Sequence, residues 1–397
     1  MKLCKNNTGV VIILVAGVLL FFLIFFLVVG IDFAYVYYVR GEVQAAADSA
    51  ALAGAALLTG EVDTDITKIL QGPARSAAWK FACKNKAAHD PVYLVNSGDP
   101  NCNNPPGNLN NSNSAAEDIV VGYWKVTPFA CASTGQTDKF CPANGSTGFP
   151  INAVKVVARR TKDSPGGEVG LIFQKIVQGL VSMGIKREAI AEWELLGTPG
   201  LSLCINSCTV SGLPKLLDIQ SNLPCGSDYG VAWTVFKSVT PIADKDIRDL
   251  IDRRLTPEDI TDLCTTNPCI TTKNGTSPID YLGDKFRDPN FYAGDKDIVS
   301  GVVTAWRVGV VIFNYNCFTG SSDPCKGCPP SKQGHPEEPY HIQQWARVTI
   351  TQVCDNNDNS GLCQGGKKGV VISDIICADC NDDPFKILKS DKPRLVK

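Results

Sequence analysis

A single, nearly unbroken apolar run near the N-terminus constrains this chain more than any other feature. The run covers residues 9–31, reads GVVIILVAGVLLFFLIFFLVVGI, and contains no charged residue, Pro, Asn or Gln. A helix of about 20 residues crosses a hydrocarbon core of about 30 Å, and a helix satisfies its own backbone hydrogen bonds in lipid. We therefore predict a transmembrane helix over residues 10–31, preceded by a short N-terminal segment, residues 1–9, in the cytoplasm.

The charges that flank the run predict its orientation. Lys2 and Lys5 precede it, Asp32 follows it at once, and the next basic residue is Arg40. Basic residues stay on the cytoplasmic side of a membrane span, so we expect everything after Asp32 to be exported.

A cleaved signal peptide is the alternative to a retained anchor. Its apolar region is normally about 7–15 residues and is followed closely by a small-residue cleavage site. Here the run is longer, and the nearest such site, Ala45-Ala46-Ala47, lies beyond Arg40 and Glu42. Both observations favour retention of the run as a membrane anchor.

The cysteines also point to an oxidising compartment. Of 17 Cys, only Cys4 precedes the span. Loop cysteines in an exported chain form disulfides, so we expect bonds among the other cysteines, although spacing alone does not fix the pairing. We expect three short-range bonds, Cys131–Cys141, Cys204–Cys208 and Cys264–Cys269. The full predicted set is Cys83, Cys102, Cys131, Cys141, Cys204, Cys208, Cys225, Cys264, Cys269, Cys317, Cys325, Cys328, Cys354, Cys363, Cys377 and Cys380.

The segment after the span, residues 32–60, is rich in Ala and reads as a helical stalk. Ala is the best helix former, so we expect one continuous helix over residues 10–58 that ends near Thr59-Gly60. Ala46, Ala50 and Gly54 recur at every fourth position, and small residues at this spacing let another element approach closely. This face packs on the chain's own domain, on a partner helix in an assembly, or on both at once.

The N-terminal region resembles TadE/TadG-like proteins of the bacterial tight-adherence (Flp) pilus-assembly machinery. The resemblance covers residues 9–60 and is carried by the apolar span, Gly30-Ile31-Asp32, Arg40 and the string QAAADSAALAGA. Its motif positions in this chain are Asp32, Gln44, Ala47, Asp48, Ala51, Leu52 and Ala53. The resemblance implies a protein of the bacterial cytoplasmic (inner) membrane with a periplasmic or extracellular, pilin-like body.

Two patterns associated with such proteins are missing. A type IV prepilin leader ends at Gly with Glu five residues later, whereas the fifth residue after Gly9 is Leu14. The Asp-x-Ser-x-Ser metal motif of von Willebrand A domains does not occur in the sequence.

The rest of the chain reads as an α+β body with mostly antiparallel strands. We expect a first part over residues 61–197, a Cys-rich, β-dominated part over residues 198–390, and a tail over residues 391–397. β-Branched and aromatic runs between turn residues predict the strands. They are residues 118–126, 151–160, 188–196, 201–205, 230–238, 298–315, 343–353 and 369–377, and helices are expected at residues 66–88 (interrupted at Gly72-Pro73), at residues 168–183 and from Thr256.

Several functions lack support in the sequence. Lys and Arg number 38 against 40 Asp and Glu, without the basic cluster that nucleic-acid binding requires. Two C-x-x-C pairs, Cys325/Cys328 and Cys377/Cys380, lie too far apart for a zinc ribbon, so disulfides are the favoured interpretation over zinc. Residues 355–361 (DNNDNSG) resemble a calcium loop, but Gly366 replaces the bidentate Glu, which favours an ordinary turn. His335 and His341 lie in a polar loop, and no catalytic motif is present.

We therefore expect no cofactor, no metal and no enzymatic activity. The leading hypothesis is a membrane-anchored structural or accessory protein of a Flp/Tad-type pilus assembly or secretion system. We expect it to bind other pilus or secretion proteins and not nucleic acid. Oligomerisation is possible. The alternative is a tethered adhesion or binding module that uses loops at residues 101–113 and 321–339, and an extracytoplasmic enzyme is the third.

Overall fold

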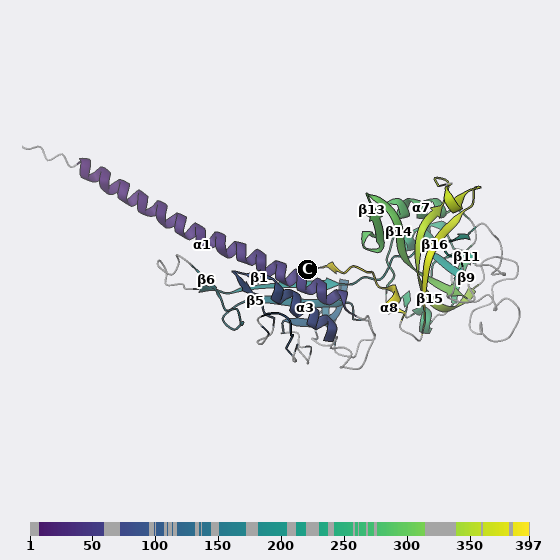
Figure 1. Cartoon of the computed structure of the whole chain (residues 1–397), viewed down its shortest axis with the longest axis horizontal. Coiled ribbons are helices and arrows are strands. Elements are labelled where there is room, and N and C mark those ends of the chain that lie inside the picture. Colours follow the sequence, from purple (N-terminus) through teal and green to yellow (C-terminus); the bar gives the residue numbers. More distant parts are fainter. Residues whose placement is uncertain are drawn as a thin grey trace, which may run out of the picture.

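The computed structural model describes most of the chain. The described residues are 8–58, 72–94, 99, 101–106, 109, 113, 117–131, 135, 137–143, 151–171, 182–204, 212–219, 230–236, 242–256, 259–260, 262–266, 269–273, 276–313, 339–358, 360–380 and 384–396. They form a long N-terminal helix, a five-stranded sheet beside it and a larger body of strands beyond (Figure 1).

The N-terminal helix, α1 (Thr8–Ala56), is 49 residues long. At 1.5 Å per residue its length is about 70 Å. Its first half exposes large apolar side chains from Ile12 to Leu27, whereas its second half buries Val36, Val39 and Val43 in the body. The continuous helix expected from the sequence is confirmed.

The first sheet has the strand order β17-β8-β5-β3-β4, and every pair is antiparallel. The second half of α1 and α3 (Gly72–Lys84) pack together against one face of the sheet. Alternate residues point to opposite faces, so Ile119 and Val121 join the core beneath the helices while Val120 joins a small cluster on the other face. The strands are β3 (Ile119–Ala130), β4 (Thr137–Pro142), β5 (Ala153–Arg160), β8 (Ile185–Glu192) and β17 (Arg394–Leu395).

Two small hairpins flank this sheet. The pair β1 (Lys86–Ala87) and β2 (Asp90–Pro91) is tied to α1, because the Ala88 N–H donates a hydrogen bond to Glu42 Oε2 at 2.9 Å. The pair β6 (Val169–Gly170) and β7 (Ser182–Met183) lies at the end of the domain nearest the exposed half of α1 (Figure 1).

The second sheet has eight strands, and five of them close into a ring. β15 pairs with both β12 and β14, and the ring continues through β11 and β9 back to β14. The β9–β14 pair is parallel, and the other pairs are antiparallel. The strands are β9 (Leu201–Cys204), β10 (Lys215–Asp218), β11 (Gly230–Thr234), β12 (Cys269–Lys273), β13 (Lys296–Val299), β14 (Val302–Phe313), β15 (Pro339–Cys354) and β16 (Gly369–Asp379).

Short helices connect these strands, and a buried lysine holds one of them. The Lys296 ammonium donates to the carbonyls of Lys285 and Asp288, at the C-terminal end of α7, where a cation is favoured by the helix dipole. Burial lowers the pKa of Lys296 to about 8. The helices are α5 (Asp244–Ile251), a π-helical turn η1 (Asp262–Thr266), α7 (Ile279–Arg287), α8 (Phe385–Leu388) and the 3-10 turns η2 (Ala293–Asp295) and η4 (Gly361–Cys363).

The expected α+β class is confirmed, with differences in single elements. Gly72-Pro73 begins α3, because Pro is well tolerated in the first turn, and the part of the expected helix before Gly72 lies outside the described residues. The expected strand at residues 298–315 is a hairpin of β13 and β14, because Ser300 and Gly301 adopt the positive φ angles of a tight turn. The short strands β4, β10 and β12 and the short helices α5 and α7 were not predicted from the sequence.

Two further segments contain short strands that the sequence did not predict. A helix was expected over residues 168–183. The two ends of this segment form β6 and β7, which pair with each other, and residues 172–181 lie outside the described part. The expected tail contains β17, because Arg394 and Leu395 pair with the edge of β8. Apolar periodicity does not predict such two-residue strands, because they form only by pairing with another strand.

Four disulfides join described cysteines. Cys264–Cys380 links positions 116 residues apart, whereas Cys354–Cys363 links positions 9 residues apart. In the chain-entropy account, a longer closed loop restricts the unfolded chain more. We expect the double variant Cys264→Ser/Cys380→Ser to lower the urea midpoint of the full chain in detergent more than Cys354→Ser/Cys363→Ser does. Equal losses would show that loop length does not control the stabilisation.

Candidate functional site: helix α1 and its attachment to the body

The first half of α1 has the surface of a membrane span. Among the described residues, Ile12–Ala56 is the one helix long and apolar enough to cross a bilayer, and no residue of its most apolar window is buried. Exposure of apolar side chains to water costs free energy, and a hydrocarbon environment removes that cost. The N-terminal part of α1 is therefore a candidate transmembrane helix.

The small-residue face of α1 is occupied by the chain itself. Ala46 and Ala50 are fully buried. A Cβ atom added to Gly54 would lie 3.1 Å from Val154 Cγ1 of β5, 3.2 Å from the Ala74 carbonyl oxygen and 3.2 Å from Ala78 Cβ of α3. The close approach that the spacing predicts therefore occurs within one chain, which is the first of the three alternatives. A partner helix in an assembly would have to use another surface.

The motif positions of the resemblance lie on and around this same face. Ala47 and Ala51 are fully buried, and Asp32 is buried where the apolar run ends. The Gln44 amide donates to Asp48 Oδ1 at 2.7 Å and to the Glu188 carbonyl of β8 at 3.3 Å. Leu52 packs at the margin of the core, and Ala53 is half-buried beside it. These residues hold α1 to the sheet.

The C-terminal end of α1 meets the connection between the two sheets. The Lys389 ammonium donates to the Leu58 carbonyl at 3.0 Å, just after the last turn of α1. Residues 192–197 lead from β8 to β9, and residues 388–394 lead from α8 back to β17. The two segments run antiparallel, since the Leu196 N–H donates to the Leu388 carbonyl and the Ser390 N–H to the Glu194 carbonyl, both at 2.7 Å. We call these two segments the joint.

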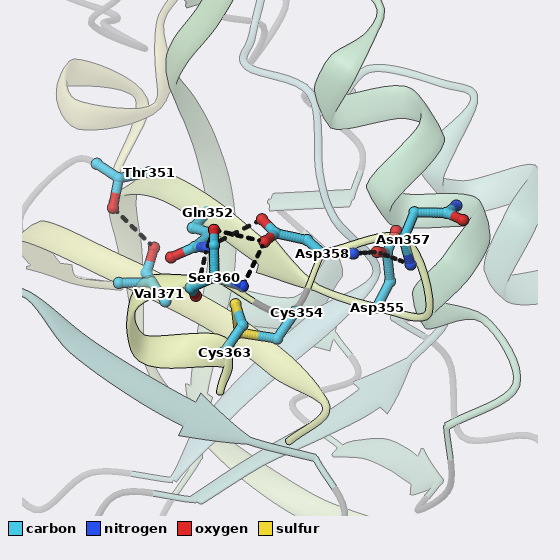
Figure 2. The surroundings of a disulfide bond; sticks show 9 residues. All are labelled: Thr351, Gln352, Cys354, Asp355, Asn357, Asp358, Ser360, Cys363 and Val371. Atoms are coloured by element: carbon cyan, nitrogen blue, oxygen red, sulfur yellow. Dashed lines mark hydrogen bonds between the residues drawn. A yellow bond between two sulfur atoms is a disulfide. The ribbon is translucent and has the colours of Figure 1, made fainter. Parts of the chain in front are cut away.

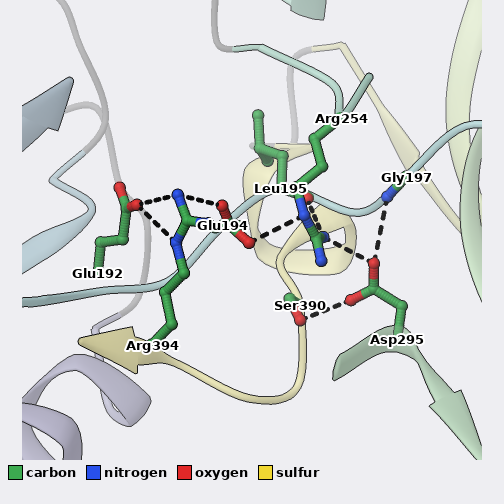
Figure 3. Close-up of polar contacts among 8 residues, drawn as sticks. All are labelled: Glu192, Glu194, Leu195, Gly197, Arg254, Asp295, Ser390 and Arg394. Atoms are coloured by element: carbon green, nitrogen blue, oxygen red, sulfur yellow. Dashed lines mark hydrogen bonds and ion pairs between the residues drawn. The ribbon is translucent and has the colours of Figure 1, made fainter. Parts of the chain in front are cut away.

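Charged side chains reinforce the joint in an alternating series (Figure 3). Arg394 contacts Glu192 at 2.8 Å and Glu194 at 2.6 Å. Arg254 in turn contacts Glu194 at 2.9 Å and Asp295 at 2.7 Å, and Ser390 donates to Asp295 at 2.6 Å. These ion pairs connect residues 192–194 and 390–394 to Arg254 and Asp295, which belong to the part of the chain that forms the eight-stranded sheet.

Burial raises the pKa of two carboxylates, Glu192 in the joint and Asp295 beside it. Desolvation raises the pKa of Glu192 to about 7, although the hydrogen bond and charge of Arg394 oppose the shift. Desolvation also raises the pKa of Asp295 above its usual range, against the opposing effect of Arg254. Glu192 can therefore change its charge near neutral pH.

The joint was not predicted from the sequence. Its signal was present, because Glu192 and Glu194 interrupt the otherwise apolar string AIAEWELL. Carboxylates are rarely buried without partners, so two of them in a core strand indicate nearby cations. The cations, Arg254 and Arg394, are distant in sequence and could not be assigned without the fold.

The disulfide expectations have mixed outcomes. Cys131–Cys141 is confirmed, whereas Cys264 pairs with Cys380 and not with Cys269. The latter expectation is wrong because the fold brings the end of β16 to η1, with the two Cα atoms 5.2 Å apart. Cys83–Cys102 is also bonded, and so is Cys377. The described side chains do not include Cys204, Cys208, Cys225, Cys269, Cys317, Cys325 and Cys328.

The calcium-like segment after β15 forms side-chain-capped turns (Figure 2). Asp355 accepts hydrogen bonds from the N–H groups of Asn357 and Asp358, and it pairs with Arg287 at 2.6 Å. Asp358 accepts from Gln352 at 2.9 Å and from the Ser360 hydroxyl at 2.8 Å. Within the described part of the chain, no three His, Cys, Asp or Glu residues are grouped as a metal site would require. His335 lies outside the described residues.

Fold and site together define an α+β protein with a candidate transmembrane helix at its N-terminal end and a disulfide-bonded body. Residues 9–57 match a family model described as putative Flp pilus-assembly TadE/G-like. The matched residues correspond closely to α1, so the N-terminal region is TadE/G-like and supports a role related to the Flp (Tad) pilus. No curated protein and no solved structure matches the chain.

The packing of Gly54 generates a test with a matched control on the same helix. A Cβ atom at Gly41 would meet nothing within 4 Å. We expect Gly54→Leu to destabilise the body by about 1–3 kcal/mol through overpacking. Gly41→Leu is expected to keep or slightly raise the urea midpoint, because Leu is the better helix former. Similar midpoints for the two variants would contradict the packing described for α1.

Glu192 generates a pH prediction. Its pKa is about 7 in the folded chain against 4.5 as the ordinary value, so the folded state holds the proton more tightly. This contribution to stability is present at low pH and is lost as pH rises from about 4.5 to 7. We expect Glu192→Gln to flatten the fall in urea midpoint between pH 5 and 7, measured by Trp fluorescence. Glu188→Gln, on the same strand, is the control and should keep the wild-type slope.

Proposed function

We propose that the chain is a membrane-anchored structural or accessory protein of a bacterial Flp/Tad-type pilus assembly or secretion system, acting through protein contacts without catalysis. The observation that carries the proposal is the coincidence of the TadE/G-like match, residues 9–57, with α1. The same helix supplies both the apolar surface and the packing face of the body, so the family resemblance corresponds to a physical unit.

The proposed topology places the N-terminus in the cytoplasm and the body outside the cytoplasmic membrane. The basic residues before the apolar run and Asp32 after it support this orientation. Four disulfides among described cysteines support an oxidising compartment for the body.

The mechanism that we propose is presentation of the body at a fixed position. Because α1 is continuous from the apolar segment into the core of the first sheet, the body cannot reorient freely relative to the anchor. The joint then connects the first sheet to the eight-stranded sheet through two backbone segments and the Arg–carboxylate series. Surfaces of both parts are thereby held at defined places for pilus or secretion-system proteins.

A tethered adhesion module remains the second candidate, and one feature favours it. The tip of the β13–β14 hairpin exposes Val299 and Val302, apolar side chains on either side of a tight turn. Exposed apolar groups on a rigid hairpin can bind a partner surface. Of the two loops that the sequence suggested for binding, the first is described at residues 101–106, 109 and 113, whereas the second, residues 321–339, lies outside the described residues except at Pro339.

Purification from the native bacterium in mild detergent tests the proposal. The tagged full chain is expected to co-purify with pilus-assembly proteins, and deletion of its gene is expected to abolish or reduce surface pili. Replacement of residues 10–31 by an unrelated transmembrane helix is the matched variant, since it keeps an anchor of the same length. Normal pili in the deletion strain, together with loss of surface adhesion, would favour the adhesion module and refute the pilus role.

A further inference from the structure

The body of the protein begins at the residue where the apolar run ends. Ile31, the last residue of the run, is 42% exposed, whereas the next residue, Asp32, is 0% exposed. Val36 and Val39 follow on the same side of α1 and belong to the core of the first sheet. A bilayer that covers α1 up to Ile31 would therefore touch the body directly, because no spacer separates them.

The opposite side of α1 stays exposed and aromatic over the same turns. Phe33, Tyr37 and Tyr38 are exposed to 62%, 77% and 64%, respectively. They continue the exposed apolar surface of the run without a charged residue between them and Ile31 other than the buried Asp32. Tyr38 also hydrogen-bonds Glu42, so its polar end is directed to a group farther from the run.

The depth of these side chains follows from helix geometry. The interfacial layer is about 5–8 Å thick on each side of a hydrocarbon core of about 30 Å. With a rise of 1.5 Å per residue, the Cα atoms of residues 33–38 lie about 3–10 Å beyond that of Ile31 along the axis. Side chains of a helix point back toward its N-terminus, which brings the ring of Tyr37 closer to the core. The three rings thus fall within the headgroup layer.

We propose that Phe33, Tyr37 and Tyr38 form an aromatic girdle in the lipid headgroup layer, and that the adjoining end of the first sheet domain rests on the bilayer surface. Tyr and other amphipathic aromatic rings favour this layer, because one end is apolar and the other forms hydrogen bonds. The occupant of this helix face is phospholipid, since the face is continuous with the surface that faces lipid. The inference depends on the membrane anchoring in the proposed function.

The part of the body nearest the bilayer then includes the β6–β7 hairpin. Val169 of β6 and Leu171 beyond it are buried in the same core cluster as Val36 and Val39. In Figure 1, β6 lies at the end of the domain toward the exposed half of α1. Contact with the bilayer on this side would restrict tilting of the whole domain.

Photocrosslinking to lipid tests the girdle in the full chain. p-Benzoylphenylalanine replaces Phe33, Tyr37 or Tyr38 singly in membranes that contain alkyne-tagged phospholipid, and the lipid adduct is quantified after irradiation. Val18 is the positive control within the run, and Leu57, which is exposed near the other end of α1, is the negative control. We expect at least a fivefold larger lipid adduct at each girdle position than at Leu57.

The outcomes separate this inference from the proposed function. Adducts at Val18 together with background levels at Tyr37 and Tyr38 would overturn the girdle and leave the anchor intact. Protein adducts in place of lipid adducts at these positions would also overturn it and would assign the face to a partner helix. Background levels at Val18 as well would overturn the anchoring itself, and with it both proposals.

Discussion

Most of this structure depends on the burial of the second half of α1 within the first sheet domain. Val36, Val39 and Val43, followed by Ala46, Ala47, Ala50 and Ala51, give the domain a fully covered helix face. The same helix continues into an exposed apolar segment, so its two halves need two different environments to cover their apolar surfaces. Protein covers one half of α1, and we propose that lipid covers the other. A change in the pitch or position of α1 would therefore affect the anchor and the core together.

The joint extends this dependence to the second body. Lys389 binds the last carbonyls of the α1 region, and the same segment carries Ser390 and Arg394 into the charged series. Carboxylates and guanidinium groups in the joint lose part of their hydration. An arrangement that left one of them unpaired would therefore be unfavourable. The raised pKa of Glu192 is the measurable sign of that loss of solvation. A structural role in an assembly is consistent with a joint that specifies one geometry.

Local sequence patterns predicted the long elements better than the short ones. The apolar run and the Ala-rich segment predicted α1 because both signals persist over many helical turns. The three long strands near the C-terminus were predicted for the same reason and form the antiparallel set β14, β15 and β16. Strands such as β10 and β17 were missed, since a few residues carry little periodicity and pair only after the rest of the sheet exists. Among the candidate site residues, Ala46, Ala50 and Gly54 were found by spacing, whereas the joint was not.

The sequence by itself determined that a membrane-compatible helix leads into a small-residue helix, because apolar length and four-residue spacing are properties of neighbouring positions. It also carried the TadE/G-like pattern of the N-terminal region. Only the tertiary structure decided that the small-residue face packs on α3 and β5 of the same chain, that Cys264 bonds Cys380, and that Arg254 and Arg394 meet the carboxylates of the joint. These contacts join residues far apart in the chain, and their free energies depend on burial and distance, which no local pattern encodes.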